Sequence, residues 1–228
     1  MTLLQNKIQQ INPLETIFTE VIPQSRLNST TTKSFKKNDK IYQPNETADR
    51  IYFVKKGRVK VVSYYDDSKE IIKNLVTVGD IFGMSALLGQ ERRVDGAVSM
   101  EDTELIVVTT ETLKSLMNDD PTLSMLIMKK LGDRLMEVEN RLEGMVYRNS
   151  RSRVIEFLKQ LVNKSGQRVG YEMLVRKFFT HQEIASLTAT SRQTVTTVLN
   201  ELRSKNILTF NRRRLLVRDM ELLVAEAK

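Results

Sequence analysis

Residues 180–217 read THQEIASLTATSRQTVTTVLNELRSKNILTFNRRRLLV. Thr180 and Glu183 have the spacing of a capping box, in which a hydroxyl and a carboxylate bond the first backbone N–H groups of a helix. A short polar turn over 188–191 separates this predicted helix from a second one over 192–204. Two short helices across a tight turn predict a helix-turn-helix.

The second predicted helix has an apolar face and a polar face. Its valines and leucines recur at helical spacing and are expected to face inward, whereas Arg192 and Gln193 face outward at its start. Arginine can bond a guanine edge with two hydrogen bonds, and glutamine can do the same with adenine. We therefore predict that these two side chains read base pairs of double-stranded DNA.

A basic hairpin is predicted after this helix. Residues 207–210 and 215–217 can form its strands, with three consecutive arginines at the tip. A basic tip beside a helix-turn-helix is typical of a wing that binds phosphates. The predicted phosphate contacts are these arginines and the hydroxyls that begin the two helices: Arg212, Arg213, Arg214, Thr180 and Ser191.

The net charge of +8 lies in the C-terminal part of the chain. Residues 1–147 hold 20 Lys/Arg against 21 Asp/Glu, whereas residues 148–228 hold 16 against 7. A basic part beside a neutral one indicates a polyanionic partner for one part only. Charge alone fits DNA, RNA, an acidic membrane surface or a solvated basic surface without a partner.

Short apolar runs separated by turns extend over 30–109, which predicts a small β-roll or barrel. A hairpin is expected where 51–54 and 59–62 flank Gly57. A helical leader is expected up to about Asn28, and turns are expected at Asp66-Asp67-Ser68 and at 164–167.

Pro121 is expected to open a long helix that ends at Tyr147, because proline is tolerated in a first helical turn. Apolar residues within it follow a 3, 4, 3, 4, 3 spacing with charged flanks, the a/d pattern of a two-stranded coiled coil. The residues of this predicted dimer seam are Met128, Leu131, Leu135, Val138, Leu142 and Met145. The alternative is an apolar stripe that packs within its own domain.

These patterns predict an α+β chain with a β-roll over 1–120, a dimerisation helix over 121–147 and a winged helix-turn-helix over 148–228. The absence of cysteine and the single histidine, His181, exclude thiolate metal sites, iron–sulfur clusters and most histidine-based catalysis. No nucleophile–base pair or glycine-rich phosphate loop is found, so we expect no enzyme, metal or cofactor. No membrane-length apolar run or signal-peptide core is found, which predicts a cytoplasmic protein without a membrane partner.

The chain resembles the Crp/Fnr superfamily of bacterial transcription regulators from about residue 31 onward. The resemblance rests on YFVKKGRV (52–59), GDIFG (79–83), the long helix, and HQEIA (181–185) through SRQTV (191–195). It implies a cyclic-nucleotide-binding-like β-roll, a central dimerisation helix and a C-terminal winged helix. It also implies homodimers on palindromic promoter sites and contact with RNA polymerase.

The family's base-reading positions fall on Arg192, Gln193 and Thr197. In the cyclic-AMP-responsive branch the second is a glutamate and the third an arginine, so a different half-site is expected here. The family's turn glycine is replaced by Ala189, a modest change if the backbone there is helical or bridging.

The resemblance further implies an effector site in the roll, and its expected residues are Gly83, Met84, Ser85, Arg93 and Arg134. The family binds cyclic AMP through a glutamate, an arginine and a serine. Met84, Val94 and Asp95 stand at those positions here. Because a carboxylate repels a cyclic phosphate, cyclic AMP is disfavoured as the effector.

Arg93 and Arg134 sit like two arginines that hold 2-oxoglutarate in the cyanobacterial nitrogen-control regulators, and an arginine fork suits a carboxylate. The alternative is that Arg93 is a surface loop residue and Arg134 a partner across the helix pair.

For the whole chain, a second class of function stays open, a sensor subunit that acts on a protein partner.

Overall fold

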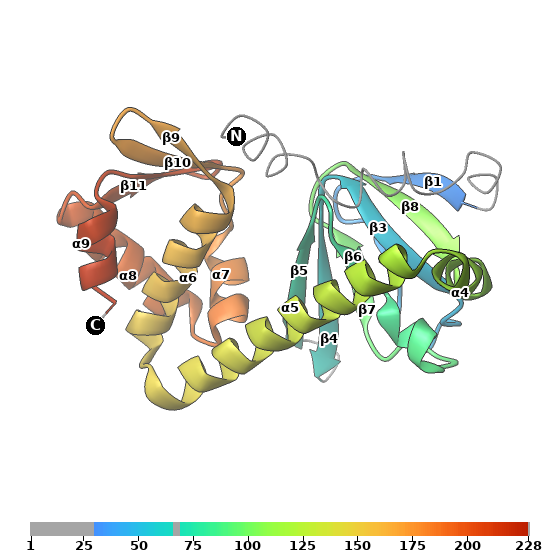
Figure 1. Cartoon of the computed structure of the whole chain (residues 1–228). Coiled ribbons are helices and arrows are strands. Elements are labelled where there is room, and N and C mark those ends of the chain that lie inside the picture. The colour runs from blue at the N-terminus through green and yellow to red at the C-terminus, as the bar shows by residue number, and fades with distance from the viewer. Residues whose placement is uncertain (1–29, 66–68, 228) are drawn as a thin grey trace, which may run out of the picture. The chain divides into compact units, whose positions relative to one another are not determined.

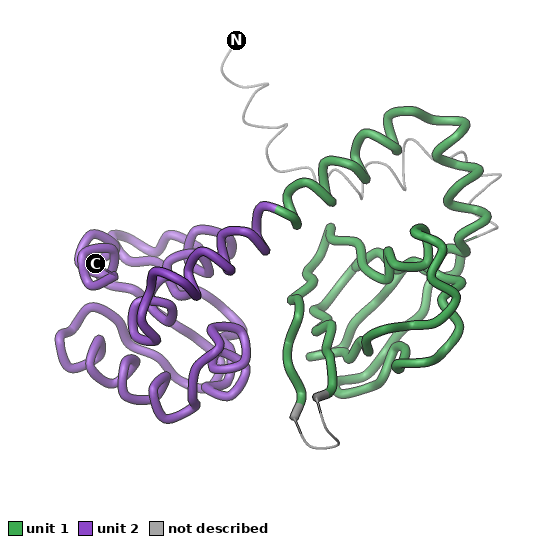
Figure 2. The backbone as a smooth tube through the Cα atoms, turned by 90° about the horizontal axis from the view of Figure 1, so that it is seen from below, with its two compact units in different colours: residues 1–135 green, residues 136–228 purple. Residues whose placement is uncertain are grey.

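The computed structural model describes residues 30–65 and 69–227; the predicted leader and the predicted turn at 66–68 lie outside them. The chain divides into two compact units, residues 1–135 and 136–228, and each is described by itself (Figure 2). The division falls within α5 (Pro121–Tyr147), which begins and ends where the sequence predicts (Figure 1). None of the described helices is long and apolar enough to cross a membrane.

Two four-stranded antiparallel sheets form the first unit, as expected for a β-roll. One sheet has the order β1 (Thr30–Phe35), β8 (Thr103–Thr109), β3 (Arg50–Lys56), β6 (Ile81–Phe82). The other has the order β2 (Lys40–Tyr42), β7 (Gly96–Ser99), β4 (Arg58–Tyr65), β5 (Lys69–Thr77). The short 3-10 helix η2 (Met84–Leu88), α4 (Thr110–Asp119) and the start of α5 complete the unit.

β3 and β4 follow one another in the chain but belong to different sheets, so the hairpin predicted around Gly57 is wrong. β3 pairs with β8 and β6, whereas β4 pairs with β5 and β7. Only Gly57 separates them, and one residue is too short for a two-residue hairpin loop. Gly57 has φ 92°, and a Cβ there would lie 2.4 Å from the Thr103 Oγ1, so the chain turns this corner only with glycine.

β3 is buried on both of its faces. Tyr52 and Val54 pack into the cluster between the two sheets, while Ile51 and Phe53 pack against α4 and α5, including Leu123 of α5. A strand with two buried faces has no need of alternating polar residues. This explains why 51–54 are apolar without interruption.

The later part of α5 exposes the predicted dimer seam. Leu123 and Ile127 are buried in the first unit, at 1% and 3% exposure. The six seam residues that follow are between 42% and 62% exposed: Met128, Leu131, Leu135, Val138, Leu142 and Met145. The alternative, that this stripe is the core of its own domain, is therefore wrong.

The second unit is a winged helix-turn-helix with additions. Its antiparallel sheet has the order β11 (Leu208–Phe210), β12 (Arg214–Val217), β10 (Glu172–Arg176), β9 (Gly166–Val169). Its helices are α6 (Ser150–Ser165), α7 (His181–Thr188), α8 (Arg192–Ser204) and α9 (Met220–Ala225). The predicted helices and wing are confirmed, but β9 begins at Gly166, inside the turn predicted over 164–167.

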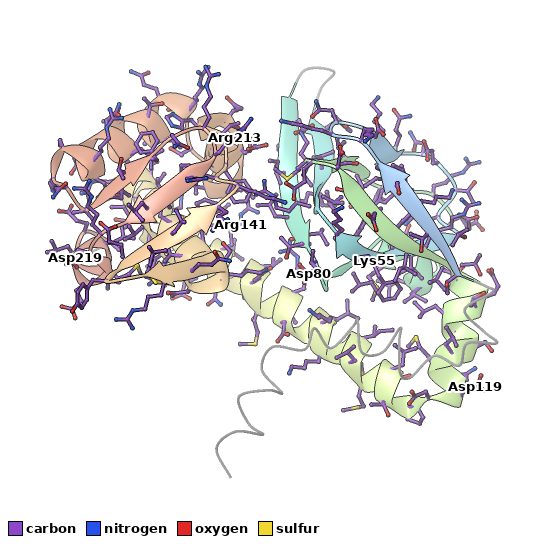
Figure 3. All side chains as sticks on the ribbon, turned by 90° about the horizontal axis from the view of Figure 1, so that it is seen from above. Lys55, Asp80, Asp119, Arg141, Arg213 and Asp219 are labelled. Atoms are coloured by element: carbon purple, nitrogen blue, oxygen red, sulfur yellow. The ribbon has the colours of Figure 1, made fainter. Side chains whose placement is uncertain are left out.

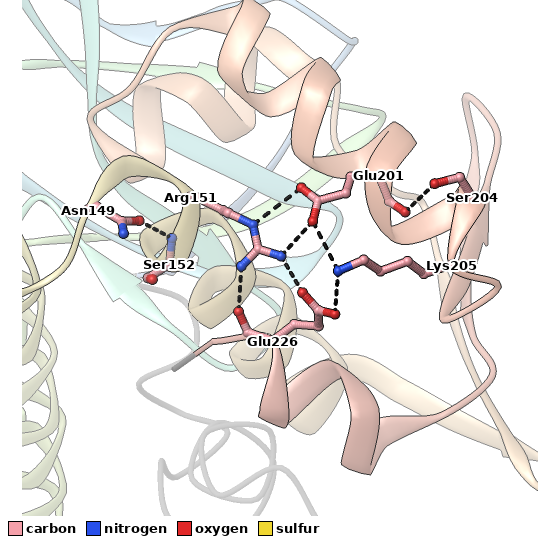
Figure 4. Close-up of polar contacts among 7 residues, drawn as sticks. All are labelled: Asn149, Arg151, Ser152, Glu201, Ser204, Lys205 and Glu226. Atoms are coloured by element: carbon pink, nitrogen blue, oxygen red, sulfur yellow. Dashed lines mark hydrogen bonds and ion pairs between the residues drawn. The ribbon is translucent and has the colours of Figure 1, made fainter.

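A four-residue ion network fastens α9 to α6 and α8 (Figure 4). Arg151 of α6 donates to the Glu201 carboxylate at 2.8 Å and to both the carboxylate and the carbonyl of Glu226. Lys205 donates to Glu226 at 2.7 Å and lies 3.2 Å from Glu201. Hydrogen bonds from Arg151 hold the pKa of Glu201 below its usual value, and those from Lys205, then Arg151, do the same for Glu226.

Candidate nucleic-acid interface

Side-chain caps set the starts of α7 and α8. The Thr180 hydroxyl accepts from the Glu183 backbone N–H at 3.2 Å, and the Glu183 carboxylate accepts from the Thr180 N–H at 2.7 Å, which confirms the capping box. The Ser191 hydroxyl caps α8 by accepting from the Thr194 N–H at 3.0 Å. Thr180 and Ser191 are both exposed, and their contact with phosphate stays a prediction.

The turn between α7 and α8 passes through a left-handed residue. Ala189 has φ 49° and ψ 51°, so the condition under which its replacement of glycine would be a modest change, a helical or bridging backbone, is not met. Its N–H and that of Thr190 both donate to the Ala185 carbonyl, which closes the end of α7. A residue with a Cβ is disfavoured in this region by about 1–2 kcal/mol. The turn is therefore strained at the position where the family has glycine.

α8 presents its predicted reading residues to solvent. Arg192, Gln193 and Thr197 are exposed, and Asn200 is exposed one turn further along. The opposite face is core, with exposures of 0% to 3% at Val195, Val198, Leu199 and Leu202. The helix is thus fixed by its apolar face and free on the face that carries hydrogen-bonding groups for base edges.

His181, the single histidine of the sequence, supports α8 from the first turn of α7. The Thr196 hydroxyl donates to the Arg192 carbonyl at 2.9 Å, so its oxygen accepts from the Nδ1–H of His181 at 2.8 Å. Burial, and then the positive charge of Arg192, lower the pKa of His181 below 6.5. The neutral imidazole is the form that this arrangement favours.

The wing is held against α7 and α8 by Phe210. The Phe210 ring lies 5.7 Å from the His181 ring, and the Arg203 guanidinium lies 5.1 Å above it. At the tip, the Asn211 side-chain oxygen accepts from two backbone N–H groups at 2.9 Å each, which orders the turn. The tip arginines are all exposed, as predicted: Arg212, Arg213 (labelled in Figure 3) and Arg214.

Two arginines that sequence reasoning missed bond backbone carbonyls of the helix-turn-helix. Arg153 of α6 donates to the carbonyls of Thr188 and Ala189, at 2.9 Å each. Arg141 of α5 donates to the Ser186 carbonyl at 3.3 Å. Part of the basic charge of this unit therefore serves its own fold. Nothing local in the sequence marks these contacts, which join residues 35 to 45 positions apart.

In the roll, Arg93 is buried, with 2% exposure, so its alternative assignment as a surface loop residue is wrong. Its guanidinium donates to the Gly83 carbonyl at 3.0 Å and to the Arg50 carbonyl, and lies 4.4 Å from the Tyr42 ring centroid. Its Nε has no hydrogen-bond partner among the described residues. Because Gly83 has φ 78° and a Cβ there would lie 3.0 Å from Arg93, glycine suits this position.

Of the other expected effector residues, Gly83 accepts a hydrogen bond from Arg93, whereas Met84 and Arg134 make other contacts. Met84 packs against the cluster that faces α4 and α5, and Ser85 lies in η2. Arg134, half-exposed on α5, donates to the Lys73 carbonyl at 2.7 Å. Asp95 accepts from the Tyr42 hydroxyl at 3.3 Å and from Lys73 at 3.1 Å.

Burial, and then the Asp95 charge, raise the pKa of the Tyr42 phenol above its usual range. Tyr42 thus stays a neutral donor to Asp95 beneath the Arg93 guanidinium. Among residues 30–65 and 69–227, no cluster of three or more histidine, aspartate or glutamate side chains could hold a metal ion.

Comparison with known proteins agrees with both units. The cyclic nucleotide-binding domain family matches residues 32–120, and the Crp-like helix-turn-helix domain family matches residues 152–226. The chain is 29% identical to the global nitrogen regulator of Nostoc sp., over 81% of this chain and 84% of that protein. It is 25% identical to a CRP-like cAMP-activated global transcriptional regulator of Mycobacterium tuberculosis, over 85% and 87%.

Among solved structures, a CooA variant from Carboxydothermus hydrogenoformans aligns with a TM-score of 0.82 at 28% identity, covering 96% of this chain and 97% of that one. The two curated relatives are named as regulators and not as enzymes, which agrees with the sequence prediction. Two matched domain families in this order, a shared architecture and the exposed polar face of α8 lead to one assignment. The chain belongs to the Crp/Fnr superfamily of DNA-binding transcription regulators.

Proposed function

We propose that the protein works as a homodimer on palindromic promoter sites, with each copy of α8 reading one half-site. The observation that carries the proposal is the exposed start of α8, where Arg192 and Gln193 stand free above a buried apolar face. The exposed seam of α5 supports pairing of two chains in parallel. A parallel pair can set two reading helices about 34 Å apart, one turn of DNA. The family resemblance supports contact with RNA polymerase at such promoters.

The test is selection of DNA sites from a random pool, followed by affinity measurements on single-base variants of the selected site. Arg192→Ala is expected to cost about 1–3 kcal/mol of specific binding and to relax preference at one base pair per half-site. The control is Arg168→Ala, which removes an exposed arginine of β9 outside α8 and the wing. An unchanged base preference in Arg192→Ala would contradict the assignment.

We further propose that the roll takes a small anionic effector other than cyclic AMP. The buried Arg93, with an Nε that no described residue bonds, supports an anion at this point. Met84 and Val94 stand where the family has the glutamate and the arginine that bind cyclic AMP, so cyclic AMP would lack both of these partners here. The relatives' names include both a cAMP-activated regulator and a nitrogen regulator, so family membership alone does not choose between effectors.

Calorimetry against cyclic AMP, cyclic GMP and 2-oxoglutarate tests the effector proposal. We expect 2-oxoglutarate to bind and Arg93→Gln to abolish that binding, with no heat from the cyclic nucleotides. Micromolar binding of cyclic AMP that tightens DNA affinity would overturn this assignment. Tight DNA binding without response to any of the three would favour a regulator controlled by its own abundance.

A further inference from the structure

Arg153 lies in the first turn of α6 but bonds elements outside that helix. Its Nε donates to the Thr188 carbonyl and its Nη2 to the Ala189 carbonyl, both at 2.9 Å. Its Nη1 donates to the Arg148 carbonyl at 2.9 Å, and Nη2 also donates to the Ser150 hydroxyl at 3.3 Å. Four of the five guanidinium N–H groups are therefore used.

This placement is unfavourable for α6 and favourable for α7. A cation near a helix N-terminus opposes the helix dipole, whereas a cation at a C-terminus complements it. Arg153 lies at the start of α6 and at the end of α7. We therefore attribute the stabilising role of Arg153 to its hydrogen bonds with the last carbonyl of α7 and with the turn that follows.

The turn needs such support because Ala189 is left-handed. Arg153 bonds the carbonyls of the two peptide groups that flank Ala189. It does so with a fork of two parallel N–H donors, a geometry that arginine has and lysine lacks. Ser191 and Arg192 follow within three residues, so the direction of these peptide groups sets where α8 begins.

We propose that Arg153 is a positioning residue for DNA reading, which holds the left-handed turn and thereby places the start of α8. The body of α8 does not depend on it, since four buried apolar residues anchor that helix. Loss of the fork should therefore shift Arg192 relative to its base pair more than it unfolds the unit. The inference rests on the proposed reading role of Arg192.

The experiment compares Arg153→Lys with Arg151→Gln in thermal unfolding and in affinity for the selected site and its single-base variants. Arg151 is the matched control, because it also bonds across the unit from α6 but does so at Glu201 and Glu226, away from the turn. We expect both variants to unfold at lower temperature. Only Arg153→Lys should lose discrimination at the base pair that Arg192 reads, by about tenfold, the scale of one lost base contact.

A second substitution separates positioning from direct contact with DNA. Ala189→Gly removes the strain at the turn, so Arg153→Lys combined with Ala189→Gly should regain most of the discrimination. A direct phosphate contact would instead leave discrimination intact in Arg153→Lys and, if the lysine substitution disturbs that contact, lower the salt dependence by about one unit. That result, or failure of the glycine to rescue, would overturn the inference.

The proposed reading role can fail separately. If the wild-type chain shows no preference at that base pair, the assignment of Arg192 falls, and the positioning inference falls with it. If the wild type discriminates and Arg153→Lys discriminates equally well, only the positioning inference is overturned.

Discussion

Ala189→Gly should stabilise the protein. The alanine holds φ 49° and ψ 51°, a region that costs a residue with a Cβ about 1–2 kcal/mol. Glycine adopts it freely but loses about 0.5–1 kcal/mol more conformational entropy on folding. At the midpoints of these two ranges, the difference is a gain of about 0.75 kcal/mol. For a unit of this size, that raises the midpoint of thermal unfolding by about 3–6 °C.

Differential scanning calorimetry of the full chain measures this change in the transition that contains the second unit. The matched control is Ala225→Gly, since Ala225 is exposed and lies in the ordinary helix α9. There, at the last residue of α9, the same chemical change should destabilise by well under about 1 kcal/mol, because glycine is a poor helix former. The two substitutions are thus expected to differ in sign.

If Ala189→Gly lowers the unfolding temperature as Ala225→Gly does, the turn does not carry the strain derived from its dihedral angles. That result would mean that the left-handed turn costs nothing, or that the Ala189 methyl makes a contact worth more than the strain. Affinity for a selected DNA site should not fall in Ala189→Gly, because the Arg153 hydrogen bonds go to backbone carbonyls that glycine retains.

The other predictions concern the seam, the wing and the histidine. Leu142→Glu places like charges on the proposed seam and should yield monomers in sedimentation velocity. Tyr147→Glu, the control, lies outside the a/d series and should remain dimeric. A dimeric Leu142→Glu variant would disprove the seam. Replacing the three tip arginines with alanine should weaken all DNA sites alike and lower the salt slope by up to about 3 per protomer, and an unchanged slope would rule out phosphate contact. Because the pKa of His181 is lowered in the fold, the neutral ring contributes stability that is complete above pH 6.5 and is lost as pH falls through the lowered pKa. His181→Asn should remove this part of the pH dependence of unfolding. Identical pH profiles for the wild type and the variant would contradict a lowered pKa of His181.

The local features of the helix-turn-helix and wing can be predicted from the sequence. The capping box, the polar start of α8 and the basic wing tip are each set by residues within four positions of one another, and all three are found as predicted. The conformation of Ala189 is the local exception. Its φ depends on how α7 and α8 pack, and alanine itself favours another region.

Long-range contacts are what the sequence does not reveal. The strands around Gly57 are predicted correctly, but their partners are not, because pairing depends on whether one residue can make a hairpin or a corner. The burial of Arg93, the fork of Arg153 and the attachment of α9 by Arg151 join residues 10 to 75 positions apart. An arginine in the sequence is read first as surface charge, and only the folded chain shows which arginines bond backbone carbonyls.

The burial of β3 on both faces limits how its neighbourhood can respond to change. A strand with one face in water can adapt to a change by rotating a side chain into the solvent. Residues 51–54 cannot do so, because all four side chains are buried. Tyr52 lies 5.6 Å from the Arg93 guanidinium, and its chain neighbours Ile51 and Phe53 pack against the helices. Close-packed interiors transmit strain instead of absorbing it. A displacement of Tyr52 by any molecule at Arg93 must therefore be matched, one peptide bond away, by the surface on which the first turns of α5 rest.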